Sequence, residues 1–158
     1  MNTQKLTQKS LEAIQAAQQL TIENQNQQIE QVHLLSALLQ QDGGLVPQLL
    51  KKMGISVESL DAAVTAEVNK LPRVTGSGRE ADRFYVSRQV DEALTKSEEL
   101  AKGMKDDFVS VEHLLLALID EKDMERVYVQ EENFRQGLKL GLSLGWEVFR
   151  CEDEPHCF

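Results

Sequence analysis

The hydrophobic residues of this chain recur at helical spacing, and one such pattern is written twice. Residues 90–104 place apolar or small side chains at spacings of three, four and seven, which is the stripe of an amphipathic helix. The order His-Leu-Leu-x-Ala-Leu starts at His33 and again at His113. Both segments are apolar around nearly their whole circumference, which predicts two buried central helices.

The shift along the sequence that carries His33 onto His113, which we call the repeat shift, aligns more than these two segments. The further aligned pairs are Ala13 and Ala93, Leu20 and Leu100, and Ile29 and Val109. The match covers two consecutive helical patterns and the loop between them, so it indicates a tandem repeat. Thr7 and Ser110 each stand just before a helical pattern, where we expect their hydroxyls to accept a first-turn N–H.

The first copy continues with two more helical patterns. Residues 42–44, Asp-Gly-Gly, are a helix stop, and residues 45–54 predict a short helix that ends at Gly54. Ser56 is a candidate N-cap for a helix whose apolar residues run from Val57 to Val68. The first copy is therefore predicted to be a four-helix unit. Sustained strand alternation occurs only in "LKLGLSL", residues 138–144, so the predicted fold class is all-α.

These patterns predict a repeat domain over residues 1–123 and a divergent tail over residues 124–158. Within the domain, copy one covers residues 1–70 and copy two residues 83–123. The linker, residues 71–82, includes "PRVTGSGRE" and offers little to bury. The repeat shift aligns the last helix of copy one with apolar residues of the tail, so we expect a helix over residues 134–149. Because the third helix of copy one has no good counterpart, we expect this tail to be the least stable part.

Composition narrows the class of function. The chain has 158 residues, of which 41% are hydrophobic and 27% charged, as in an ordinary globular protein. No apolar run is long enough to span a membrane, and the N-terminus lacks a signal core. Both cysteines fall in the last eight residues, which favours a cytoplasmic protein without disulfides. The net charge of −9 argues against binding to the phosphate backbone of nucleic acid. The sequence has no Gly-Lys pair and so no phosphate-binding loop, which predicts that the chain does not bind nucleotide.

Three patterns could carry chemistry, and each has a plainer explanation. "GLSLG", residues 141–145, fits a serine-hydrolase motif, but that motif needs a strand before Ser143 that an all-α chain does not supply. Cys151, His156 and Cys157 have the wrong spacing for a zinc site. His33 and His113 are expected to be structural histidines that bond to loop backbone. The prediction is a protein that is not an enzyme and that has neither a metal nor a cofactor.

The repeat resembles the Clp amino-terminal repeat, the N-terminal domain of Clp ATPases, and most closely that of ClpB-type disaggregases. The segments that carry the resemblance are "LTQKSLEAIQAAQ", "IEQVHLLSALLQQDGG", "LLKKMGI", "LPRVTGSG", "ALTKSEELAK" and "FVSVEHLLLALID", within residues 5–122. The resemblance implies a pseudo-twofold tandem repeat of two four-helix units, the second completed atypically. It also implies a chaperone module that engages unfolded or aggregated polypeptide ahead of an ATP-driven ring in protein disaggregation and the stress response.

The resemblance also suggests which residues would bind a client protein. It places an apolar groove along the start of the helices of copy two and their connecting loop, which by position nominates Leu94, Phe108 and Val109. The rim would be Thr7, Asp106 and Glu112, whose acids suit basic unfolded segments. Each has a plainer alternative: Leu94 and Val109 as core residues, Thr7 as a helix cap, Glu112 as a first-turn acid and Asp106 as a loop residue.

Three functional hypotheses remain open at this point. The first is a truncated disaggregase that lacks its ATPase modules. The second is a free-standing adaptor or competitor for the Clp machinery. The third, from another class, is a serine hydrolase that uses Ser143. We expect unfolded polypeptides, and possible contact with Clp ATPases, as the partners.

Overall fold

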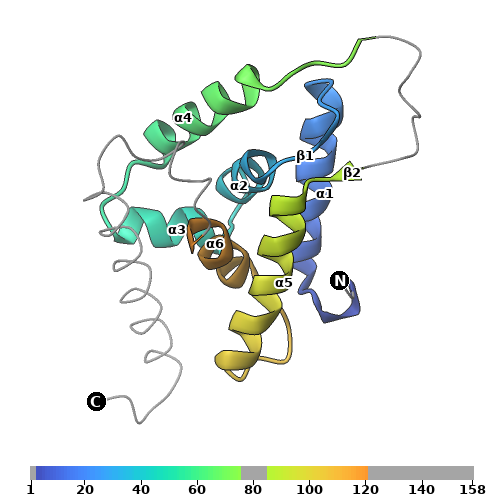
Figure 1. The fold of residues 1–158 in the computed structure, drawn as a ribbon. Helices are drawn as coiled ribbons and strands as arrows, with labels where there is room; N and C mark the ends of the chain where they lie inside the picture. Colours follow the sequence, from blue (N-terminus) through green and yellow to red (C-terminus); the bar gives the residue numbers. More distant parts are fainter. Residues whose placement is uncertain (1–2, 76–84, 121–158) are drawn as a thin grey trace.

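The computed structural model describes residues 3–75 and 85–120, which form a layered bundle of helices with two very short strands (Figure 1). The elements in chain order are η1 (Thr3–Lys5), α1 (Gln8–Glu23), β1 (Gln28–Ile29), α2 (Gln31–Leu39), α3 (Leu45–Lys52), α4 (Val57–Lys70), β2 (Tyr85–Val86), α5 (Arg88–Gly103) and α6 (Val111–Asp120). The all-α prediction is confirmed, and all four helices of the first copy are present.

Helix α2 lies at the centre of this arrangement. All nine of its residues are buried, as its apolar circumference predicted. It contacts α1, α3, α4 and α6, and Figure 1 shows it between α1 and α4. Helix α6 carries the second His-Leu-Leu-x-Ala-Leu segment and lies against α5, α2 and α3. The two repeated segments are therefore the buried helices that the pattern indicated.

One hydrophobic core runs through both copies. Leu38 and its counterpart Leu118 are both fully buried and belong to the same cluster of buried side chains. Burying a leucine stabilises the fold by about 1.5–3 kcal/mol, so the two copies share their main source of stability.

Short backbone pairs tie the two copies together. In the parallel pair of β1 with β2, Ile29 lies opposite Val86, and a separate parallel bridge joins Leu6 to Val109. Each pair joins one copy to the other, and the repeat shift relates the two pairs. The sequence did not indicate these strands, because a pair of one or two residues is too short to show alternation.

The helix ends are also related by the repeat shift. Gln25, after α1, has a left-handed φ of 57°, and Lys105, after α5, has a φ of 63°. The hydroxyl of Thr7 accepts the N–H of Ser10, so the predicted N-cap of α1 is confirmed. Ser87 caps α5 in the same way, although the sequence analysis had not singled it out.

Several sequence predictions concern residues outside the described ranges. They include the helix over residues 134–149, the Ser143 motif and the Cys151–Cys157 cluster. The relation of the two copies by a twofold rotation, and the four-helix form of the second copy, stay predictions. In the part of the chain that the structure describes, no helix is long and apolar enough to cross a membrane.

Residues 71–74, at the start of the predicted linker, contact the loop after α1. The N–H of Val74 donates to the carbonyl of Gln25 at 2.8 Å, and the amide of Asn26 donates to the carbonyl of Pro72 at 3.2 Å. Leu71 packs against the core. This stretch is therefore held on the first copy.

Candidate functional site

The loop between α5 and α6, residues 104–110, holds three of the nominated residues and is fixed at both ends. At its start, Lys105 turns left-handed and the N–H of Asp106 donates to the carbonyl of Ala101 at 2.9 Å. At its end, the N–H of Val109 donates to the carbonyl of Lys5 at 2.7 Å. A loop held in this way presents its side chains with little ordering cost on binding.

The buried ring of His113 bonds to two residues of the same loop. Its ring is 1% exposed; Nδ1 accepts the N–H of Ser110 at 2.9 Å, and Nε2 lies 3.0 Å from Oδ2 of Asp106. An acceptor Nδ1 puts the proton of the neutral ring on Nε2, which therefore donates to the carboxylate. His113 is thus a structural histidine that bonds to loop backbone, as the sequence analysis expected.

The hydroxyl of Ser110 contacts the ring of His113. Its oxygen lies 2.9 Å from Nδ1 of His113, and its role as acceptor of a first-turn N–H stays a prediction. In a capping box, a Glu or Gln three residues after the N-cap accepts the backbone N–H of the N-cap residue. Here the imidazole of His113 accepts that N–H. The cap therefore depends on the histidine.

His33 repeats this arrangement in the first copy. Its Nδ1 accepts the N–H of Glu30 at 2.9 Å, and its Nε2 lies 2.9 Å from the side-chain oxygen of Asn26. The ring is fully buried, and this burial lowers its pKa to about 4. The prediction of a structural histidine is confirmed here too.

Two of the nominated residues lie in the core. Val109 is 2% exposed and Leu94 is 7% exposed, and both belong to the hydrophobic cluster. The carbonyl of Val109 accepts the N–H of Thr7 at 3.0 Å and the hydroxyl of Ser10 at 2.9 Å. The alternative that these two side chains are packing residues is the one that their burial favours.

The remaining four nominated residues are accessible and lie on or beside the loop. Phe108 is 54% exposed, the side chain of Asp106 is 41% exposed, and Glu112 is half-buried in the first turn of α6. Thr7 is half-buried and joins this surface through its backbone bond to Val109. We call Phe108, Asp106, Glu112 and Thr7 the Phe108 surface. Its apolar part is one aromatic ring, and its polar part includes the carboxylates of Asp106 and Glu112.

A second set of exposed apolar residues lies at the other strand pair. Val74, Tyr85 and Val86 are 36%, 56% and 45% exposed. Their exposure could not be predicted from the sequence, because a short strand beside a linker gives no signal of which side faces solvent. Tyr85 is the described aromatic residue whose exposure matches that of Phe108.

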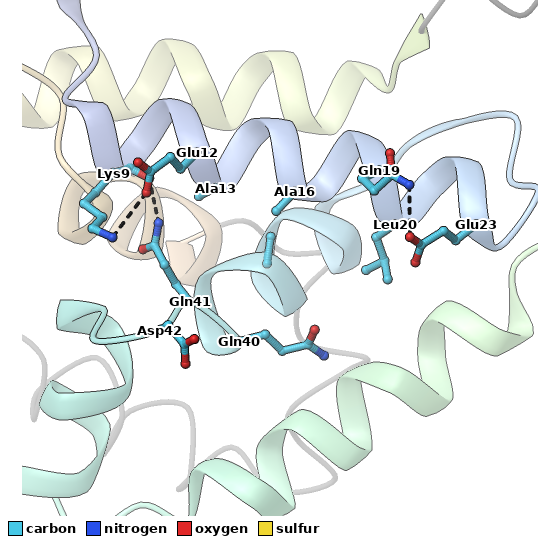
Figure 2. Close-up of a pocket in the computed structure, with 11 residues that line it drawn as sticks. Lys9, Glu12, Ala13, Ala16, Gln19, Leu20, Glu23, Gln40, Gln41 and Asp42 are labelled. Atoms are coloured by element: carbon cyan, nitrogen blue, oxygen red, sulfur yellow. Dashed lines mark hydrogen bonds and ion pairs between the residues drawn. The ribbon is translucent and has the colours of Figure 1, made fainter.

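A groove of about 390 Å³ lies on the first copy, and none of its lining residues belongs to the Phe108 surface (Figure 2). It is bounded by α1, the end of α2 and the turn that follows, and all of its lining residues fall between Lys9 and Asp42. Its floor is apolar and consists of Ala13, Ala16, Leu20 and Ala37. Among the described residues, no group of three or more His, Cys, Asp or Glu is placed to hold a metal ion.

The structure defines an all-helical repeat domain. In this domain, the two histidine loops and the two strand pairs are related by the repeat shift. Residues 5–132 match the protein family described as the Clp repeat (R) N-terminal domain. The chain belongs to this Clp family, and the resemblance found in the sequence is confirmed.

Curated relatives and solved structures agree with this assignment. The chain is 35% identical to the chaperone protein ClpB of Bacillus cereus over 143 residues, which are 87% of this chain and 16% of that protein. It is 36% identical to ClpB of Nitratidesulfovibrio vulgaris over 121 residues, which are 77% of this chain and 14% of that protein. The chain thus spans about a sixth of the length of the ClpB proteins it matches.

The fold matches the N-terminal domain of Hsp104 from Candida albicans, with a TM-score of 0.75 at 22% identity, over 87% of this chain and 89% of that one. It also matches a ClpV N-domain in complex with a VipB peptide, with a TM-score of 0.60 at 21% identity, over 89% and 88% of the two chains. At these identities the likeness shows the fold alone. The chain therefore has the fold of the Hsp104 and ClpV N-domains.

Proposed function

We propose that this chain is a non-enzymatic binding module that captures unfolded or aggregated polypeptide, with the Phe108 surface as its contact. The observation that carries the proposal is Phe108, an aromatic ring that is more than half exposed on a loop fixed at both ends. Exposing such a ring to water forgoes the free energy of burying it, and aromatic side chains dominate binding hot spots.

The charges of this surface suit such a client. Asp106 and Asp107 are exposed in the same loop as Phe108, and Glu112 is half-buried in the first turn of α6. Carboxylates around an apolar contact attract basic segments and speed the encounter without fixing one sequence. A chaperone module needs weak contact that tolerates many sequences, and one aromatic ring with a charged rim provides it.

The family membership supports a binding role of this kind. Among solved structures of the same fold, the ClpV N-domain has been captured with a VipB peptide. We propose that this chain acts in the cytoplasm as the client-engaging part of a Clp disaggregase, within a longer chain or beside the machinery as an adaptor. The hydrolase alternative receives no support from the described residues, since Ser143 lies outside them.

The test compares two exposed aromatics. Phe108→Ser should lower the affinity for unfolded casein by fivefold or more, because the anchor of the surface is removed. Tyr85→Ser is the matched control, since Tyr85 is equally exposed at the other strand pair, and it should leave the affinity within about twofold. Both changes should alter the free energy of unfolding by less than about 0.5 kcal/mol. Fluorescence anisotropy and urea unfolding give the two readouts.

Leu94→Ser tests whether Leu94 is a core residue or a binding residue. It should lower the free energy of unfolding by about 2–5 kcal/mol, because a buried leucine is removed. If the wild-type protein has no affinity for casein at high micromolar concentration, the proposed function is wrong.

A further inference from the structure

The residues that line the groove on the first copy indicate what kind of partner could bind there. Its floor is formed by three alanines and Leu20, which offer apolar contact without bulk. Its volume of about 390 Å³ falls in the range of sites that hold a few side chains rather than a whole domain. None of its lining residues belongs to the Phe108 surface.

The hydrogen-bond donors of the groove are already directed at the protein. The amide nitrogen of Gln19 donates to Glu23 at 3.0 Å, that of Gln40 to Asp61 at 3.1 Å, and that of Gln41 to the carbonyl of Lys9 at 2.9 Å. The ammonium group of Lys9 is paired with Glu12 at 3.2 Å (Figure 2). One N–H of each of these groups is engaged in this way, so a partner meets fewer free donors, and the groove also presents acceptors.

Those acceptors are carboxylates and amide oxygens. Three carboxylates, of Glu12, Glu23 and Asp42, line the groove against the single ammonium of Lys9. Hydrogen bonds from Lys9 and then Gln8 lower the pKa of Glu12, which keeps this carboxylate ionised. The side-chain oxygen of Gln41 is buried and has no hydrogen-bond partner in the described part of the chain. A buried acceptor without a donor is costly, and a donor brought by a partner would remove that cost.

We propose that this groove docks a short basic and apolar segment of a partner polypeptide, with an arginine as its principal anchor. The aliphatic part of an arginine lies over the alanine floor, while its planar guanidinium supplies several donors to the carboxylates and to Gln41. Charge complementarity selects this occupant over the chain's own tail, since residues 121–158 carry nine acidic and five basic residues.

The probe is a fluorescein-labelled peptide, acetyl-Ala-Leu-Arg-Ala-Leu-Arg-Ala-Leu-amide, measured by fluorescence anisotropy against the full chain. We expect saturable binding that weakens severalfold when salt is raised from about 50 to about 300 mM, because screening grows with ionic strength. The same peptide with citrulline in place of arginine keeps the shape and loses the charge. It should bind at least about fivefold more weakly.

Two exposed neighbours on α1 give a matched pair of variants. Ala16→Arg places a bulky cation in the groove and should weaken peptide binding about tenfold or more. Gln15→Arg adds the same charge at the adjacent position, outside the lining, and should change binding less than about twofold. Both positions are exposed, so neither change should unfold the protein.

A second pair of variants tests the rim. Glu23→Gln combined with Asp42→Asn should weaken binding about threefold to tenfold. Glu98→Gln combined with Glu99→Gln removes the same charge from α5 and should have little effect.

The proposal is overturned if the wild-type chain does not bind the arginine peptide, if the citrulline peptide binds equally well, or if Gln15→Arg and Ala16→Arg weaken binding alike. Phe108→Ser should leave peptide binding unchanged while it lowers casein binding. Loss of peptide binding in Phe108→Ser would place the peptide on the Phe108 surface and overturn the groove. Loss of casein binding by itself concerns the proposed function only.

Discussion

The two histidine loops of this domain share one geometry and differ in charge. In each, a buried imidazole accepts a backbone N–H three residues earlier and bonds through Nε2 to a side chain seven residues earlier. That side chain is Asn26, which is 4% exposed, in the first loop. In the second it is Asp106, whose side chain is 41% exposed.

The apolar residues that pair with the two loops differ in the opposite direction, because Leu6 pairs with Val109 of the second loop and Val86 with Ile29 of the first. Leu6 is 9% exposed, whereas Val86, its counterpart under the repeat shift, is 45% exposed. The second loop also carries Phe108 where the first has Gln28. The histidine and the left-handed turn fix the backbone of both loops, so charge and exposure are free to vary. Of the features that differ, the carboxylate of Asp106 and the ring of Phe108 are the ones we assign to binding.

The largest effect should come from the shared core. Leu38→Ala and Leu118→Ala, at equivalent positions that are both fully buried, should each lower the free energy of unfolding by about 2–5 kcal/mol. Urea unfolding followed by circular dichroism measures both. Because one core joins the copies, each variant should unfold in a single transition. Two separate transitions in either variant would show that the copies are independent.

The next effect concerns the histidine with the neutral partner. Since the folded pKa of His33 is about 4 and the unfolded value about 6.5, only the unfolded chain takes up this proton between these pH values. The free energy of unfolding should therefore fall as pH drops through this window, by about 1.4 kcal/mol per unit and about 3 kcal/mol in all.

His33→Gln removes this group and provides the comparison. Its stability at pH 7 should be lower than that of the wild type, because the cap bond to Glu30 is disturbed, but its further loss down to pH 4.5 should be smaller. Urea unfolding across the pH range gives both numbers. An unchanged pH slope in this variant would contradict the assignment of the acid sensitivity to His33.

The smallest effect tests the equivalence of the two left-handed turns. Gln25→Gly and Lys105→Gly should each change stability by about 0–1 kcal/mol in the favourable direction, because glycine removes the left-handed strain but adds unfolded-state entropy. Gly54→Ala, at a φ of 74°, is the reverse control and should lose about 1 kcal/mol. Thermal unfolding resolves these differences. Opposite signs at Gln25 and Lys105 would show that the turns are not equivalent.

Much of this fold could be predicted from the sequence because helical periodicity is a local signal. The buried helices around His33 and His113, the four helices of the first copy, and the caps at Thr7 and Ser56 all follow from spacing within a few residues. The strand pairs could not be predicted, because Leu6 and Val109 are brought together by tertiary packing and their own neighbours carry no strand pattern.

The candidate surface was predictable only in part, for a related reason. An apolar residue in a loop looks the same in sequence whether it is buried, as Val109 is, or exposed, as Phe108 is. The groove gave no sequence signal, since alanines and glutamines on a helix are typical of an ordinary solvent-facing side. Its character depends on where the amide nitrogens are directed, and that depends on residues distant in the chain.

The strand pairs that join the two copies affect how the domain can fold while it is being synthesised. Ser10 and Val109, which share a hydrogen bond, are 99 residues apart. The hydrogen bonds from the hydroxyl of Ser10 and the N–H of Thr7 to the carbonyl of Val109 therefore cannot form until nearly the whole domain has left the ribosome. The first copy emerges with its helices able to form but with one edge unpaired, which is a state exposed to aggregation. A module proposed to capture incomplete proteins thus passes through such a state itself.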